Sequence, residues 1–505
     1  MRTLFSPLFR PAPNFFHDGP ENPAIAFSAI LSDTLRSFLR RPAKAQETRP
    51  MIPGRCKKPC SLMKKGALMT YDLIIENGIL LTVDADSHIY EDGLICVAGG
   101  EIMFAGPREK APEGKDARQV LDAGGGIIMP GLVNSHTHVP MSIFRGLADD
   151  LPLETWLNEH IFPAEAAHIN PQTVRIGTLL SCAEMLLSGT TCFCDGYFYE
   201  DAVAQAASET GLRAVLAHGI IDFPAPGVPD PSQNVQASVS YAKEWKGKTP
   251  LITPSIFCHS AYTCSAETIQ NAKKEAAALG VLLQIHAAES KFEHTQSMER
   301  HGLSPVQYLD GLGVLDQNTL LVHGVWVDDK DMEILSQKKA AVSVTTHSEM
   351  KLASGVAPIP AYLRAGVRVG LGTDGPASNN NHDMFGETGL TAKIHKALDL
   401  DPTELDAATA IALASRMSAD AIGLGAVTGS LEKGKRADII VIDLNAPNMT
   451  PMYHPDSAVV YAASADNVKH VFVDGRQLVE DGRLTGMDIG QIMHEVRGLA
   501  KIIGG

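Results

Sequence analysis

The chain carries the stretch Gly126-Ile-Ile-Met-Pro-Gly-Leu-Val-Asn-Ser-His136-Thr-His138. Its apolar run is typical of a buried strand. Because side chains of a strand alternate between its two faces, His136 and His138 must point in the same direction. Two imidazoles that converge on one point indicate half of a metal site. The rest of the chain therefore has to supply the other half.

Apolar runs of strand length recur along the chain and alternate with amphipathic segments. Counting the first stretch, the eight runs cover residues 127–138, 190–195, 213–221, 251–259, 281–286, 319–325, 340–345 and 367–373. Segments with helical period lie between them, among them residues 171–188, 266–279 and 328–338. Strands and helices that alternate in this way predict a (β/α)8 TIM-type barrel, whose active site lies at the C-terminal ends of the strands.

The residues on either side of this region predict a smaller β domain. Short strands punctuated by Gly fill the chain before the barrel, and similar strands return near the C-terminus. We expect residues 69–125 and 427–485 to form one composite β-sandwich, residues 126–426 the barrel and residues 486–505 a C-terminal helix. Residues 1–68 are rich in Pro, Arg and Lys, and we expect them to form a disordered extension.

The composition excludes several classes of protein. The 505 residues carry a formal net charge of -15 at pH 7, which would repel a phosphate backbone. A membrane-spanning helix needs an apolar run of about 18 residues, and the sequence contains no run of that length. The eight cysteines are scattered, which is typical of reduced, buried cysteines. We therefore expect a cytoplasmic protein with a small-molecule ligand and without a nucleic-acid polymer or a membrane as partner.

Titratable residues stand at the predicted ends of the later strands. The fourth strand ends at His259, the fifth at His286 with Glu289 just beyond it, the sixth at His323 and the eighth at Asp374. These positions meet at one mouth of a barrel, so the residues indicate a single site. Neutral imidazoles together with one carboxylate suit a divalent ion of borderline softness, zinc first and iron next.

We expect four of these side chains to hold one metal ion. The predicted ligands are His136, His138, His286 and Asp374. No lysine stands at the end of the fourth strand to bridge a second ion, so the sequence favours a single metal.

The same residues predict a hydrolytic reaction. A zinc ion lowers the pKa of a bound water to about 7 in favourable sites. Asp374 can take the proton from that water, and Glu289, three residues past a ligand, can deliver a proton to a ring nitrogen and then to the leaving group. His323 can hold the hydroxide or a developing alkoxide. We therefore expect displacement at an electrophilic carbon, with ammonia or another group leaving.

Several segments together resemble the amidohydrolase superfamily, and within it the branch of the 5-methylthioadenosine/S-adenosylhomocysteine deaminases and their triazine-hydrolase relatives. They are the stretch ending in His136-Thr-His138, Ile161-Phe-Pro-Ala-Glu165-Ala, Cys258-His259-Ser-Ala-Tyr-Thr-Cys-Ser, Ile285-His286-Ala-Ala-Glu289-Ser, Lys351-Leu-Ala-Ser-Gly, Gly-Thr-Asp374-Gly and Gly429-Ser-Leu-Glu-Lys-Gly-Lys-Arg-Ala-Asp438. The resemblance implies a β-sandwich beside the barrel and a homo-oligomer. It also implies that Glu165 binds ribose hydroxyls and that His259 contacts the substrate.

Two departures from that family bear on the substrate. Relatives that accept S-adenosylhomocysteine use Arg to bind its carboxylate, whereas this chain has no Arg between Arg213 and Arg300. A buried carboxylate without such a partner is costly, so we expect an uncharged 5' group, as in 5'-deoxyadenosine or 5'-methylthioadenosine. Glu349 stands where relatives often have Asn, which changes the charge near the end of the seventh strand.

The leading hypothesis is an enzyme that hydrolytically deaminates an adenosine-like nucleoside to the inosine analogue and ammonia. One alternative is a deaminase or dehalogenase of a free heterocycle, such as a guanine-like base, a pterin or a triazine, which would not need Glu165. Another is a non-catalytic scaffold on the same fold, which would not need a bound ion.

Overall fold

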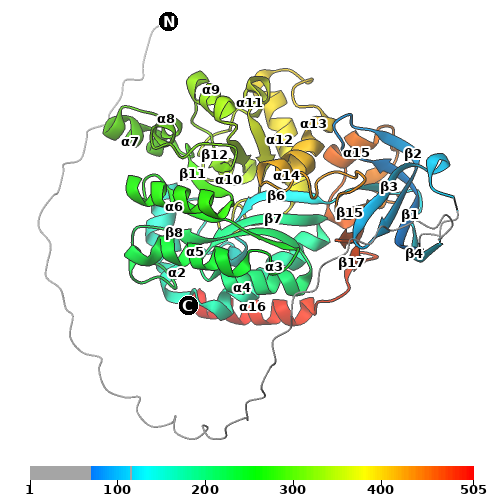
Figure 1. Cartoon of the computed structure of the whole chain (residues 1–505), viewed down its shortest axis with the longest axis horizontal. Coiled ribbons are helices and arrows are strands. Elements are labelled where there is room, and N and C mark those ends of the chain that lie inside the picture. The colour runs from blue at the N-terminus through cyan, green and yellow to red at the C-terminus, as the bar shows by residue number, and fades with distance from the viewer. Residues whose placement is uncertain (1–69, 114–115, 505) are drawn as a thin grey trace, which may run out of the picture. The chain divides into compact units, whose positions relative to one another are not determined.

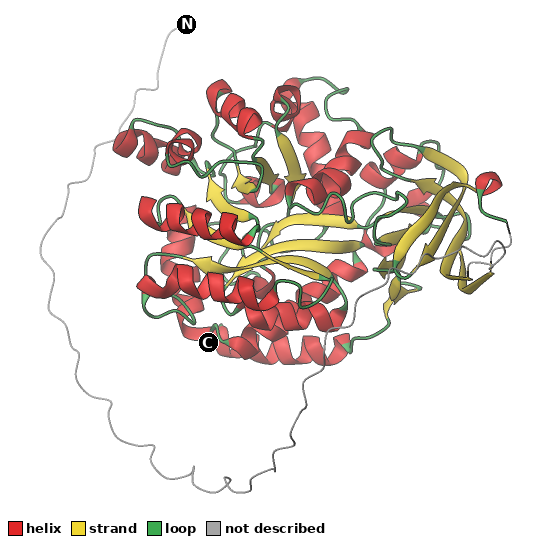
Figure 2. Cartoon of the chain, viewed as in Figure 1, coloured by secondary structure: helices red, strands yellow, loops and turns green. Residues whose placement is uncertain are grey.

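The computed structural model describes residues 70–113 and 116–504 of the chain. The extension expected over residues 1–68, with its boundary at Met69, lies outside the described residues. Two sheets organise the described chain, one enclosed by helices and one beside them (Figures 1 and 2).

Eight parallel strands form the enclosed sheet, in the order β14-β13-β12-β11-β10-β8-β7-β6, with the short β9 paired to β8. Their bounds are β6 Leu132–Thr137, β7 Thr190–Tyr197, β8 Arg213–Ile220, β9 Ile252–Pro254, β10 Ile256–Ser260, β11 Leu283–Ala287, β12 Thr319–His323, β13 Ala341–Val344 and β14 Arg368–Leu371. Every residue of β6, β7 and β8 is buried, as is typical of parallel strands covered by helices.

Main-chain hydrogen bonds join the end of the last barrel strand to the first. The amides of Thr373 and Asp374, which follow β14, donate to the carbonyl of His136 at 3.1 and 3.0 Å. The Thr373 amide also lies 3.0 Å from Oδ1 of Asn134, which accepts from it. The barrel is therefore nearly closed, and the predicted (β/α)8 architecture is confirmed.

Helices surround the barrel (Figure 2). The long helices after the barrel strands are α3 Pro171–Leu187, α4 Glu200–Thr210, α5 Asn234–Trp245, α6 Ala266–Leu279, α7 Lys291–His301, α9 Asp329–Lys338 and α12 Met384–Asp399. The shorter ones are α1 Leu153–Thr155, α2 Phe162–His168, α8 Pro305–Gly311, α10 Thr346–Lys351, α11 Ile359–Ala365, α13 Ala407–Ala412, α14 Ser418–Ala421 and α15 Pro455–Tyr461. The three helices predicted from periodicity correspond to α3, α6 and α9 to within one residue at each end.

The run over residues 127–138, predicted as one strand, is two strands in the structure. Its first half, β5 (Ile127–Pro130), belongs to the other sheet, and only its second half starts the barrel. The break falls at Gly131, where a Cβ would lie 2.1 Å from the side chain of Thr191. The run over residues 251–259 is likewise divided, into β9 and β10.

Strands from both ends of the described chain form the second sheet, in the order β18-β17-β16-β15-β5-β1-β2-β3, with β4 paired to β1. Their bounds are β1 Thr70–Leu81, β2 Ile89–Ala98, β3 Glu101–Pro107, β4 Asp116–Asp122, β15 Ile439–Ile442, β16 Val468–Val473, β17 Arg476–Glu480 and β18 Arg483–Leu484. One apolar cluster unites the two ends, since Leu73 and Ile95 pack with Ile439 and Phe472. The predicted small β domain built from both chain ends is confirmed, whereas the exact domain boundaries stay predictions.

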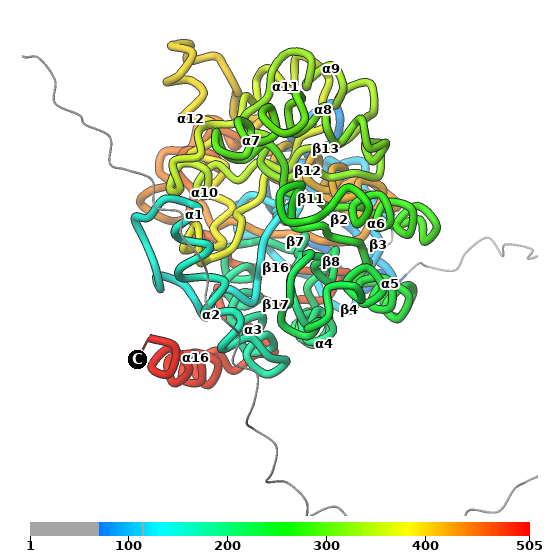
Figure 3. Tube along the Cα trace, turned by 90° about the vertical axis from the view of Figure 1, so that its left-hand side faces the viewer, coloured from blue at the N-terminus to red at the C-terminus, as the bar shows by residue number. Residues whose placement is uncertain are grey.

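The stretch expected to be helical at the C-terminus contains α16 (Ile489–Ile503), which lies along α3 (Figure 3). Its Ile492 packs against Leu179 of α3. No helix among the described residues is long and apolar enough to cross a membrane. The six cysteines in the described part of the chain are all buried.

A buried ion pair ties the barrel to the β domain. Arg213 begins β8, and its Nε and Nη2 donate to Oδ2 and Oδ1 of Asp438, just before β15, at 2.6 and 3.0 Å. The two side chains are 2% and 0% exposed. Such bidentate geometry compensates for the desolvation of both charges. Removal of Arg213 would leave the charge of Asp438 buried without its cation.

We predict that Arg213→Met lowers the free energy of unfolding by about 3–5 kcal/mol, because Asp438 then stays buried without its cation. Calorimetric unfolding of the variant and the wild type measures the difference. Arg175→Met is the matched control, because the Arg175–Glu209 pair is about half exposed at 45% and 53%. We expect that control to cost less than about 1 kcal/mol. Equal losses of unfolding free energy in the two variants would contradict the proposal that the buried pair stabilises the fold more than the exposed pair does.

Candidate active site

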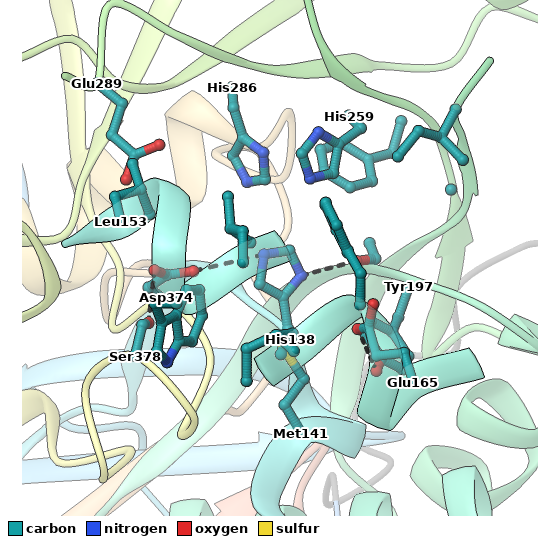
Figure 4. Close-up of a pocket in the computed structure, with 18 of the residues that line it drawn as sticks. His138, Met141, Leu153, Glu165, Tyr197, His259, His286, Glu289, Asp374 and Ser378 are labelled. Carbon is teal, nitrogen blue, oxygen red and sulfur yellow. Dashed lines mark hydrogen bonds and ion pairs between the residues drawn. The ribbon is translucent and has the colours of Figure 1, made fainter. Parts of the chain in front are cut away.

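Three histidines and one aspartate meet at the C-terminal mouth of the barrel. Figure 4 shows three of the four, His138, His286 and Asp374. His136 and His138 come from the end of β6, His286 from β11 and Asp374 from the turn after β14. The nitrogens of the three histidines lie within 4.8 Å of one another. Oδ1 of Asp374 lies 3.6 Å from Nε2 of His136 and 3.4 Å from Nε2 of His138.

The protonation of this cluster fits a bound cation. Burial lowers the pKa of His136 to about 3 and also lowers the pKa values of His138 and His286, so the three imidazoles are neutral. Burial would raise the pKa of Asp374, but the neighbouring histidines outweigh it and hold that pKa well below its usual range. Neutral imidazoles and an ionised carboxylate are the form in which these residues bind a divalent metal ion.

Hydrogen bonds behind the cluster fix the direction of its donor atoms. Nδ1 of His138 lies 2.8 Å from the carbonyl of Gly196, which leaves Nε2 facing the cluster. Ser348 and Ser378 donate to Oδ2 of Asp374 at 2.6 and 2.7 Å, which leaves Oδ1 facing the histidines. Partners of this kind orient ligands and raise metal affinity.

Glu289 and His323 lie together beside the cluster. Nε2 of His323 is 3.8 Å from Oε2 of Glu289. Its Nδ1 is 3.1 Å from the hydroxyl of Thr345 and 3.5 Å from Oε1 of Glu349. Burial lowers the pKa of His323, but the charge of Glu289 and the hydrogen bond of Glu349 outweigh it and raise the pKa to about 9. Burial raises the pKa of Glu289.

Glu165 stands in the same pocket, on α2 (Figure 4). Its Oε1 accepts a hydrogen bond from Tyr197 at 2.6 Å. Burial raises the pKa of Glu165 to about 7, against the effect of that hydrogen bond. His259 faces the pocket from β10, its ring 5.2 Å from the ring of His286, and burial lowers its pKa to about 3.

One pocket joins these groups. Its open space, which includes the solvent at its mouth, amounts to about 760 Å³. Its wall is mostly apolar and includes Met141, Leu153, Trp156, Leu157, Ile161, Phe162, Phe198, Ile220, Ile221 and Phe257. The arrangement can hold a flat apolar ligand with polar groups at its ends.

The structure brings all eight residues singled out in the sequence to this pocket. Seven of them line it, and His136 lies buried directly behind His138 and His286. The sequence did not indicate Tyr197, Ser348 or Ser378. Tyr197 lies two residues past the predicted end of its strand, so a longer strand would have placed it at the mouth. No local signal marks the two serines.

Comparison with known proteins gives one family. A model of the Amidohydrolase family matches residues 127–478. A 5-methylthioadenosine/S-adenosylhomocysteine deaminase of Syntrophobacter fumaroxidans is 43% identical over 432 residues, which are 86% of this chain and 98% of that protein. A 5'-deoxyadenosine deaminase of Methanopyrus kandleri is 40% identical over 424 residues, 83% of this chain and 96% of that protein.

Solved structures of similar proteins superpose on most of this chain. An adenosine deaminase of Xanthomonas campestris with bound zinc superposes with a TM-score of 0.84 at 34% identity, over 86% of this chain and 99% of that one. An atrazine chlorohydrolase of Arthrobacter aurescens with zinc gives 0.78 at 23% identity, over 85% and 100% of the two chains. The second likeness shows the fold alone.

We predict that Ser348→Ala weakens metal binding by about 10–100-fold, because the Asp374 carboxylate loses one of the two hydroxyls that hold its Oδ2. Competition with a chromogenic chelator measures the affinity.

The matched control is Ser354→Ala. The hydroxyl of Ser354 is buried and has no hydrogen-bond partner among the described residues. Its loss should therefore leave metal affinity unchanged. If the Ser348→Ala protein bound the metal as tightly as the control, the proposed role of Ser348 in orienting Asp374 would be wrong.

Proposed function

Because this chain belongs to the amidohydrolase family, we propose that it is a metal-dependent aminohydrolase that converts an adenosine-like nucleoside to its inosine analogue and ammonia. The observation that carries the proposal is the single apolar pocket that joins Glu289, beside the histidine cluster, with the buried carboxylate of Glu165. A purine nucleoside has the matching ends, a ring that can be protonated and a pair of ribose hydroxyls. The names of the similar proteins support the same substrate class.

The proposed metal ligands are His136, His138, His286 and Asp374. A single zinc ion is the proposed occupant, with iron second, since the donor set suits both and a similar structure carries zinc. When bound, such an ion supplies an activated water by lowering its pKa to about 7.

Asp374 and Glu289 are the proposed proton carriers. Asp374 is ionised and points Oδ1 into the cluster, so that atom can accept a proton there. Burial keeps a proton on Glu289 at a pH where an exposed glutamate would lose it. Glu289 can therefore donate to a ring nitrogen and afterwards to the leaving amine.

His323 is proposed to stabilise negative charge that develops on oxygen. Its raised pKa, about 9, keeps both ring nitrogens protonated at neutral pH. The contacts of Nδ1 with Thr345 and Glu349 hold the ring, and Nε2 faces the site beside Glu289. A donor fixed in this way stabilises a developing oxyanion without reorganisation.

The opposite end of the pocket is proposed to bind the sugar. Glu165 would accept hydrogen bonds from the ribose hydroxyls, and His259 would contact the substrate between the two ends. No lysine or arginine is among the described residues that line the pocket. This supports an uncharged 5' group, as in 5'-deoxyadenosine or 5'-methylthioadenosine, over S-adenosylhomocysteine. A homo-oligomer in the cytoplasm, without nucleic-acid partners, stays a prediction from the sequence.

Ammonia release from purified, metal-loaded protein tests the proposed function. We expect turnover of 5'-deoxyadenosine and 5'-methylthioadenosine, with a higher kcat/KM than for adenosine or S-adenosylhomocysteine. Guanine, a pterin and an aminotriazine form the second arm. Turnover confined to that arm would identify a deaminase of free heterocycles instead.

Glu289→Gln should lower kcat on the best nucleoside by about 10²–10⁴-fold, because the amide cannot donate the carboxyl proton. Metal content should change little, since Glu289 contacts the substrate and is not among the proposed metal ligands. Glu154→Gln is the control, because Glu154 lines a neighbouring cavity and not this pocket. If the Glu289→Gln enzyme kept the kcat of the control, the proposed role of Glu289 in proton transfer would be wrong.

A further inference from the structure

Tyr197 is the polar neighbour of Glu165 inside the pocket. Its hydroxyl donates to Oε1 of Glu165 at 2.6 Å (Figure 4). The two residues are 4% and 6% exposed. Among the described residues, this is the one side-chain donor to that carboxylate, and no cation pairs with it. The carboxylate therefore depends on one neutral hydroxyl for its position and its charge.

The strand that carries Tyr197 also supports the histidine cluster. Gly196 precedes it, and a Cβ at Gly196 would lie 2.5 Å from the ring of Phe257 inside the barrel. The side chain of Tyr197, the next residue, reaches Glu165 of α2. The carbonyl of Gly196 meanwhile binds Nδ1 of His138. The end of β7 thus contacts both His138, a proposed metal ligand, and Glu165.

The bond from Tyr197 leaves an acceptor free. Oε2 of Glu165 accepts no hydrogen bond from the described residues, and Glu165 lines the pocket. A vicinal diol offers two O–H donors, and a carboxylate with one oxygen already engaged still has acceptor sites for both. Because burial raises the pKa of Glu165 to about 7, the Tyr197 hydrogen bond also helps to keep the carboxylate ionised.

We propose that Tyr197 is a positioning residue that, by holding Oε1 of Glu165, makes the enzyme selective for nucleosides with both ribose hydroxyls. This inference rests on the proposed function. Tyr197 acts through Glu165 on binding, and the proton transfers at the other end of the pocket do not depend on its hydroxyl.

Tyr197→Phe tests the inference with a matched substrate pair. The pair is 5'-deoxyadenosine and 2',3',5'-trideoxyadenosine, which differ in the two ribose hydroxyls alone. For the first we expect KM to rise about tenfold or more with kcat nearly unchanged, the size of effect that a lost hydrogen bond to a charged group gives. For the second, kcat/KM should not change. A rise in KM that is equal for both substrates, or no rise for either, overturns the inference.

Two further variants separate positioning from general stability. Tyr241→Phe is the matched control, because the Tyr241 hydroxyl is buried without a hydrogen-bond partner among the described residues and the side chain does not line the pocket. Its kinetics should equal those of the wild type. In a Glu165→Ala background, Tyr197→Phe should add no further rise in KM, since its effect passes through Glu165. Additive losses in the double variant also overturn the inference.

A measurement of ligand binding tests the role of Tyr197 independently of the proposed deaminase activity. If no nucleoside releases ammonia, the proposed function is wrong. Calorimetric titration of the metal-loaded protein with the same two compounds then still tests whether Tyr197 supports binding of the ribose hydroxyls. The inference predicts tighter binding of 5'-deoxyadenosine than of the trideoxy analogue, with the difference lost in Tyr197→Phe. Equal affinities for the two ligands, or a difference that survives the substitution, overturn it.

Discussion

The hydrogen bonds that join the end of β14 to β6 are the constraint on which the site depends. The carbonyl of His136 accepts from the amides of Thr373 and Asp374 at 3.1 and 3.0 Å. These bonds bring residues from the two extremes of the barrel sequence to one point, so a proposed ligand from the first strand meets a proposed ligand that follows the last. The buried Arg213–Asp438 pair adds a second constraint, because it ties the barrel to the β domain.

Burial acts in opposite directions on the two kinds of titratable group in the pocket. It lowers the pKa values of the imidazoles of the cluster, and it raises the pKa values of Glu289 and Glu165. His323 is the exception, since Glu289 and Glu349 outweigh its desolvation. Neutral imidazoles in the cluster and a charged imidazole at His323 can therefore coexist in one apolar pocket near neutral pH.

Local patterns predicted the parts of the molecule that repeat or alternate. The barrel strands, the helices α3, α6 and α9 and the residues at the strand ends follow from hydrophobic period and from the geometry of a barrel. Contacts between segments that are distant in the sequence could not be predicted from these local patterns. Tyr197 meets Glu165, and Ser348 meets Asp374, only because the fold places them there. The division at Gly131 was missed because an apolar run can pass through two sheets without a change of composition.

Anomalous diffraction from crystals of the protein purified without chelators would locate a metal ion at the histidine cluster. Data on both sides of the zinc edge should show a single peak about 2.0–2.3 Å from nitrogens of His136, His138 and His286 and from an oxygen of Asp374. A second peak beside it would contradict the single-ion site. An empty cluster, or a metal bound elsewhere, would contradict the proposed metal site and the hydrolytic reaction that depends on it.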